Sequence, residues 1–195
     1  MNLLSIVLLF VLQSSPLAGD VPGNLVLDPH ATNGGAGWRG GNDATVENVN
    51  GNHSFVVRNK GRFQQSIAIP PVQAGGRIVL LARASSERVN ADGSITGVPY
   101  LYGLVFGVDP KRVVGYLQGQ GRDSRMRSQA TQPNQWVTLS GIFEVPDGAT
   151  RLELSLHLGE RKGDPHNGSA GRFDDIAVVV VPTLEEARAF VARYR

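Results

Sequence analysis

Eight side chains on predicted strands have the chemistry of a surface that binds a sugar ring. A tyrosine offers a flat aromatic face that packs against C–H bonds, and guanidinium, carboxylate, amide and imidazole groups can fix hydroxyls at its edge. This hypothesis requires that the strands share one sheet; otherwise the tyrosines only complete the core, with their hydroxyls at its margin. The candidate ligand-binding residues are Arg58, Arg83, Glu87, Tyr100, Tyr102, Tyr116, Gln118 and His157.

A second candidate site is the carboxylate pair Asp174 and Asp175, which precedes the apolar stretch Ile176–Pro182. The β-branched residues of this stretch predict a central strand that is covered on both faces. Strict alternation would place Asp175 on the face of Phe173 and Asp174 on the face of Ile176. A carboxylate buried there must be compensated by water, a cation or hydrogen-bond donors.

The sequence contains no spacing that matches a known catalytic set. The G-x-S-x-G, H-E-x-x-H and P-loop motifs are missing, and the four histidines form no i, i+4 pair. The chain has no cysteine, which excludes disulfides, thiolate zinc sites and a cysteine nucleophile. A glycan-cleaving enzyme would need Glu87, Tyr102, Tyr116 and His157 in one groove. We therefore expect a protein that binds without catalysis, and keep the enzyme as a third hypothesis.

Composition favours a single all-β domain. A chain of 195 residues fits one domain, and its 24 glycines and 11 prolines point to many short strands joined by turns. The formal net charge is only +2, and the basic residues are spread along the chain. General affinity for nucleic acid is therefore not indicated.

Period-two alternation of apolar and polar residues predicts the strands that position these side chains. A short strand is also expected at Asn24–Asp28, and a capping box at Thr183–Glu186 predicts a C-terminal amphipathic helix over residues 183–195. The main strands are expected at Thr45–Asn48, His53–Asn59, Arg62–Ile69, Arg77–Val89, Pro99–Asp109, Val113–Gln120, Trp136–Pro146, Ala149–Glu160 and Ser169–Pro182.

The first 20 residues have the pattern of a signal peptide. An apolar run, Leu3–Leu12, is followed by small and polar residues up to Gly19. Ten apolar residues fall short of the roughly 20 that span a bilayer, so stable membrane insertion is not expected. The predicted location is secreted or cell envelope, either periplasmic or extracellular.

Several framework motifs resemble those of jelly-roll carbohydrate-binding modules of the galactose-binding-like superfamily. They are the opening Asn24-Leu-Val-Leu-Asp-Pro29 with Gly37-Trp38, the strand Trp136–Pro146, and the closing Gly171-Arg-Phe-Asp-Asp-Ile176. The resemblance covers residues 24–182 and implies an antiparallel jelly-roll β-sandwich. It also implies a secreted, non-catalytic protein that binds a polysaccharide or oligosaccharide, with Trp38 filling the core beneath its loop. The alternative is a structural or protein-interaction domain of the cell envelope that lacks a sugar site.

The same resemblance implies a structural calcium ion, because superfamily members typically combine a carboxylate of the closing pair with an acidic residue of the opening loop. The matching residues here are Asp28, Asp174 and Asp175. The expected acidic position falls near Thr32, which leaves Asp28 as the nearby carboxylate and favours a latch without metal. In that case the aspartates would cap loop amides or pair with Arg172 or Arg39.

Overall fold

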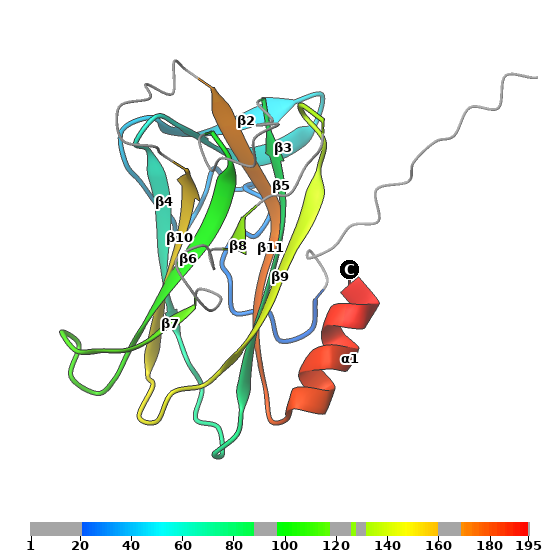
Figure 1. Ribbon diagram of the computed structural model, residues 1–195. Coiled ribbons are helices and arrows are strands. Elements are labelled where there is room, and N and C mark those ends of the chain that lie inside the picture. The colour runs from blue at the N-terminus through cyan, green and yellow to red at the C-terminus, as the bar shows by residue number, and fades with distance from the viewer. Residues whose placement is uncertain (1–20, 88–96, 118–125, 128–131, 160–168, 195) are drawn as a thin grey trace, which may run out of the picture.

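Two antiparallel β-sheets packed face to face form the computed structural model of the protein (Figure 1). The structure describes residues 21–87, 97–117, 126–127, 132–159 and 169–194. The proposed signal peptide and Gln118 lie outside this part of the chain. The predicted all-β, antiparallel jelly-roll sandwich with a short C-terminal helix is confirmed.

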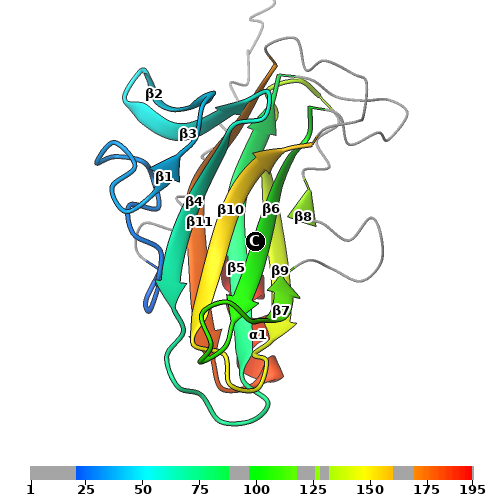
Figure 2. The same cartoon turned by 90° about the vertical axis from the view of Figure 1, so that its left-hand side faces the viewer.

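The first sheet, sheet A, carries all of the predicted aromatic candidates. Its strand order is β1-β4-β10-β6-β7, and β8 also pairs with β6. Figure 2 shows β4, β10 and β6 side by side across this sheet. The strands are β1 (Arg39–Gly40), β4 (Arg62–Ala68), β6 (Pro99–Phe106), β7 (Val113–Leu117), β8 (Met126–Arg127) and β10 (Arg151–Leu158).

The second sheet, sheet B, has the order β2-β3-β11-β5-β9 and contains the closing stretch as its central strand. The β-branched run near the chain end therefore occupies the position predicted for it. The strands are β2 (Ala44–Val49), β3 (Asn52–Arg58), β5 (Arg77–Ser86), β9 (Val137–Glu144) and β11 (Ala170–Val181).

The main core lies between the two sheets and follows the alternation of each strand. On β10, the inward leucines are buried, whereas the residues between them point to the outer face. Fixing one face to the core fixes the register, because a slip by one residue would move every leucine to the outside. The inward residues of β10 are Leu152, Leu154, Leu156 and Leu158.

The alternation predicted for β11 is wrong at the carboxylate pair, because a β-bulge interrupts the strand. The register with β5 shifts between Asp174 and Ala177, and Asp175 has a positive φ of 52°. The extra residue returns Ile176 to the core side, the side of Phe173. Asp174 therefore lies on the outer face, and Asp175 occupies the bulge instead of the face of Phe173.

The C-terminal helix α1 (Leu184–Tyr194) packs on the outer face of sheet B (Figure 1). Thr183 is its N-cap: the Glu186 amide donates to the Thr183 hydroxyl, and the Thr183 amide donates to the Glu186 carboxylate, which confirms the predicted capping box. Ala187 is fully buried against the sheet. Within the described residues, no helix is long and apolar enough to cross a membrane.

The opening segment is not the short strand predicted at Asn24–Asp28. Only Leu25 makes a backbone hydrogen bond to β11, from its amide to the Val178 carbonyl at 2.9 Å. The Asn24 side chain replaces the rest of a ladder, since its oxygen accepts from the Val26 and Val178 amides. The segment is therefore tied to β11 by a side chain, and it leads into the glycine-rich loop.

Candidate functional site

Two cross-strand rows of side chains stand on the outer face of sheet A. Antiparallel pairing places Tyr100 of β6 opposite His157 of β10, and His157 opposite Arg62 of β4. One step along, Tyr102 is opposite Ser155, which is opposite Gln64. Opposed residues on neighbouring strands are within contact distance, so each row is continuous across three strands.

These rows line a groove of about 360 Å³, which we call the tyrosine groove. The rings of Tyr100 and His157 are stacked, with centroids 5.1 Å apart and planes within 10°. Tyr102 meets the same imidazole edge-on at 6.5 Å, and the Gln64 amide donates to the Ser155 hydroxyl at 3.1 Å. Among the residues that the structure describes, the lining is Arg62, Gln64, Tyr100, Tyr102, Leu104, Ser155 and His157.

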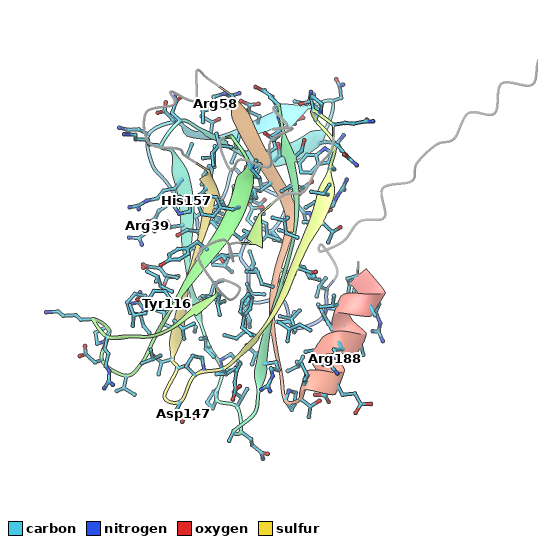
Figure 3. All side chains as sticks on the ribbon, viewed as in Figure 1. Arg39, Arg58, Tyr116, Asp147, His157 and Arg188 are labelled. Atoms are coloured by element: carbon cyan, nitrogen blue, oxygen red, sulfur yellow. The ribbon has the colours of Figure 1, made fainter. Side chains whose placement is uncertain are left out.

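Further polar and aromatic groups border the tyrosine groove on the same face. Tyr116 of β7 is opposite Leu104 and is 54% exposed. Arg39 of β1 pairs with Glu153 of β10 at 3.2 Å. Figure 3 shows His157, Arg39 and Tyr116 on one side of the sandwich and Arg188 of α1 on the other. The groove therefore lies on the side away from the helix.

The remaining sequence candidates do not share this face. Arg58 lies on β3 of sheet B, where it pairs with Glu47 at 2.7 Å. Arg83 also belongs to sheet B, and Glu87, just beyond the end of β5, pairs with Arg172 of β11 at 2.8 Å. The seven candidates that the structure describes are therefore divided between two sheets instead of sharing one surface. Alternation along a strand shows which residues share a face, but it does not show which strands are neighbours.

The structure also adds groove residues that sequence reasoning missed. Arg62 and Gln64 alternate with the buried Phe63 and Gln65, so the pattern already placed them on an outer face. The pattern does not show which strand lies beside β4. The pairing of β4 with β10 brings Arg62 and Gln64 beside His157 and Ser155.

A cluster at the bulge of the central strand β11 of sheet B, the His30 latch, comprises His30, Asp174, Asp175 and Arg83. The His30 Nδ1 lies 2.9 Å from an oxygen of Asp175 and 3.3 Å from one of Asp174. Arg83 lies 3.3 Å from the other oxygen of Asp175, whose side chain is only 6% exposed. Next to the bulge, the Ile176 amide donates a hydrogen bond to the carbonyl of Pro29. This bond holds the loop that carries His30 against β11.

His30 and Asp175 shift each other's pKa in opposite directions. Hydrogen bonds to Asp174 and Asp175 raise the pKa of His30 from 6.5 to about 10. Burial by itself would raise the pKa of Asp175, but the His30 hydrogen bond and Arg83 outweigh it and hold that pKa below its ordinary value. At neutral pH the His30 imidazolium and the Asp175 carboxylate are therefore both charged. The partners of the aspartates are His30 and Arg83 instead of the Arg172 or Arg39 expected from sequence.

The calcium ion implied by the superfamily resemblance fits these residues poorly. Calcium prefers six to eight oxygen ligands. Here a protonated imidazole and a guanidinium already neutralise the pair, and Asp28 is not part of the cluster. The Asp28 carboxylate instead accepts hydrogen bonds from its own loop, donated by the Thr32 hydroxyl and by the amides of Asn33, Gly35 and Ala36.

Chelation should leave the melting temperature unchanged. Since His30 and Arg83 supply the positive charge, removing divalent metal should not weaken the fold, and adding calcium should not strengthen it by mass action. Thermal melts in excess EDTA and in millimolar calcium are the measurement, with magnesium as the control for ionic effects. A fall of several degrees with EDTA that only calcium reverses would identify a calcium site.

Trp38 has the core position expected of it. It is 8% exposed, its ring centroid lies 4.9 Å from that of Phe55, and its indole nitrogen donates to the Leu27 carbonyl at 2.8 Å. The ring therefore seals the glycine-rich loop over the core.

The sandwich has the jelly-roll fold of carbohydrate-binding modules, and comparison with known proteins shows how far that likeness reaches. No protein-family profile and no curated protein sequence matches the chain. Among solved structures, the tandem CBM22 domains of Paenibacillus barcinonensis Xyn10C align with a TM-score of 0.57 and 15% identity, over 85% of this chain and 51% of that one. The xylan-binding domain from CBM22 aligns with a TM-score of 0.51 and 16% identity, over 84% and 99%.

A third similar structure is an enzymatically active domain of tailspike protein 4 from bacteriophage CBA120. It aligns with a TM-score of 0.56 and 14% identity over 82% of this chain. The present chain spans only 22% of that protein's length. At these identities the likeness establishes the fold, and any activity has to be argued from this chain's own site.

Proposed function

We propose that the protein is a non-catalytic glycan-binding module that holds a polysaccharide or oligosaccharide in the tyrosine groove. The observation that carries this is the gathering of Tyr100, Tyr102 and His157 beside Arg62, Gln64 and Ser155 on one outer face. The rings offer apolar surface for the C–H faces of a sugar, and the polar groups offer donors and acceptors for its hydroxyls. Xylan binding by the similarly folded domain supports the proposal by analogy of fold alone.

Two features bear on the alternatives. Glu87 lies beyond the end of β5 on sheet B, so the set required for a glycan-cleaving enzyme does not meet Tyr102 and His157. A structural or protein-interaction domain would favour an apolar outer face, whereas the tyrosine groove combines aromatic rings with the polar groups of Arg62, Gln64 and Ser155. We further propose that the module acts outside the cytoplasm, on the basis of the signal-like residues 1–20.

Substitution Tyr102→Ala should weaken glycan binding by roughly 30-fold, as expected when a central aromatic contact worth about 2 kcal/mol is removed. The glycan is first identified on an array of plant, algal and bacterial polysaccharides, and affinities are then measured by titration calorimetry. The matched control is Tyr194→Ala, on α1 at the other side of the sandwich. Absence of binding to every glycan contradicts the function, and equal binding by both variants places it elsewhere.

A further inference from the structure

A second groove lies on the outer face of sheet B, at the end that α1 leaves uncovered. Its volume is about 500 Å³, larger than that of the tyrosine groove. Its wall includes Trp136, which immediately precedes β9 and is 36% exposed, and Asn134. We call it the tryptophan groove. No described residue lines both grooves, since the two lie on opposite sheets.

The floor of the tryptophan groove is polar although it lies over a central part of the sheet. Ser85 and Ser54 are 1% and 6% exposed and line it from β5 and β3. Arg172 of β11 is directly opposite Ser85. If this buried part of the sheet face served stability alone, apolar side chains would stabilise it more than serines do. The part of the same face that α1 covers is apolar.

Two arginines in the groove are held in fixed orientations. Arg172 is anchored by Glu87 at 2.8 Å and Arg83 by Asp175 at 3.3 Å, and the Arg83 guanidinium lies over the Trp136 ring, 5.2 Å from its centroid. A guanidinium has five N–H donors, and each of these ion pairs uses one nitrogen, so donors remain for a ligand. Because these side chains are already anchored, a ligand loses less free energy in ordering them when it binds.

The charges that line the tryptophan groove are largely compensated. Two arginines and one aspartate line it, and each arginine is paired with a further carboxylate, which leaves no strong excess of either sign. A strongly charged ligand would therefore gain little here, whereas a neutral ligand with many hydroxyls could use the donors and acceptors together. The lining groups are Arg83, Arg172 and Asp174, and the paired carboxylates are Asp175 and Glu87.

We propose that the tryptophan groove is a second glycan-binding site, which takes a neutral saccharide. The part-exposed indole of Trp136 contacts a C–H face of the sugar, while Arg172 and the amides of Asn52 and Asn134 bind its hydroxyls. The site does not rest on the tyrosine groove. If both sites bind, one domain engages two glycan segments, and its avidity for a polymer exceeds its affinity for a short oligosaccharide.

Tryptophan fluorescence tests the second site directly, because the chain has two tryptophans and the other, Trp38, is buried. The probes are soluble hexasaccharides of β-linked glucose, xylose, mannose and galactose, with an oligogalacturonate as the charged comparison. We expect one of the neutral probes to shift the Trp136 emission to shorter wavelength. The shift should disappear in Trp136→Phe, and Asn52→Ala, at the exposed first residue of β3, should weaken binding roughly fivefold.

The double variant Tyr100→Ala/Tyr102→Ala separates the two sites. It should keep the full fluorescence shift, while calorimetry shows two binding events in the original protein and one in the variant. Loss of the shift in the double variant would mean that Trp136 reports on the tyrosine groove, and would overturn the second site. If none of the neutral hexasaccharides shifts the Trp136 emission, the second site is overturned as well. The same holds if only the oligogalacturonate shifts it. Failure of the tyrosine groove to bind leaves the Trp136 shift intact, so the two proposals fail separately.

Discussion

Substitution Asp175→Ala should lower the free energy of unfolding by about 3 kcal/mol. It removes the carboxylate that pairs with both His30 and Arg83, and leaves two cations facing each other at a site where Asp175 itself is only 4% exposed. Because the two partners remain partly in contact with water, the loss falls at the lower end for a broken buried ion pair. Urea unfolding at neutral pH, followed by circular dichroism, measures it.

The matched controls separate charge from backbone. Asp175→Asn tolerates the positive φ of the bulge and keeps one acceptor oxygen, so it should cost less than alanine. Asp174→Ala removes a more exposed partner and should cost about 1 kcal/mol. A loss for Asp175→Ala no larger than that for Asp174→Ala would contradict the central role of the bulge carboxylate.

The latch also fixes the direction of the pH dependence. The Asp175 pKa is lowered, so its contribution is present above the ordinary value of 3.8 and is lost as pH falls through the lowered pKa. The His30 pKa is raised, so its contribution is complete below 6.5 and is lost as pH rises toward about 10. The latch is therefore strongest between about pH 4 and 6.5. The difference in stability between the original protein and Asp175→Ala should decline on both sides of that window.

Substitution Trp38→Ala should cost about 3 to 5 kcal/mol, since it empties a large core volume beside Phe55. That is a large part of the 5 to 15 kcal/mol that typically holds a domain folded. Chemical unfolding measures the loss, and glycan titration at low temperature should show an unchanged affinity in the tyrosine groove.

Trp38→Phe is the control for the indole hydrogen bond. It retains an aromatic ring, and the Leu27 carbonyl still accepts from the Gln65 amide, so the loss should be limited to about 1 to 2 kcal/mol. Retained stability in Trp38→Ala together with lost glycan binding would contradict a core role and indicate that the ring stacks on sugar.

Most of the fold could be predicted because alternation reports burial strand by strand. The leucines of β10 have one way to face a core, the β-branched run of β11 needs cover on both faces, and the capping box at Thr183 is a local motif. Such signals need no knowledge of which strand is the neighbour. The segment at Asn24 was wrongly predicted to be a strand. Its link to β11 is made mainly by the Asn24 side chain, and the sequence pattern of such a segment resembles that of a strand.

The sites were harder to predict because they depend on pairing order and on one irregular residue. Tyr100 meets His157 through the β6–β10 pairing, and nothing in either strand encodes the other. The bulge at Asp175 reverses the alternation that the sequence suggested, which is why its partners are His30 and Arg83. His30 had no signal beyond a lone histidine in a glycine-rich loop.

The helix α1 has a consequence for where this domain can be cut. Beneath it, sheet B presents Val79, Leu81, Ala177 and Val179 as a continuous apolar strip. The sandwich could be mistaken for a unit that closes at Pro182, but shortening the chain there would turn an internal surface into an adhesive one, and such chains would associate with each other. We therefore expect the smallest autonomous unit to include the helix through Tyr194, so a partner fused on the C-terminal side has to be joined beyond it.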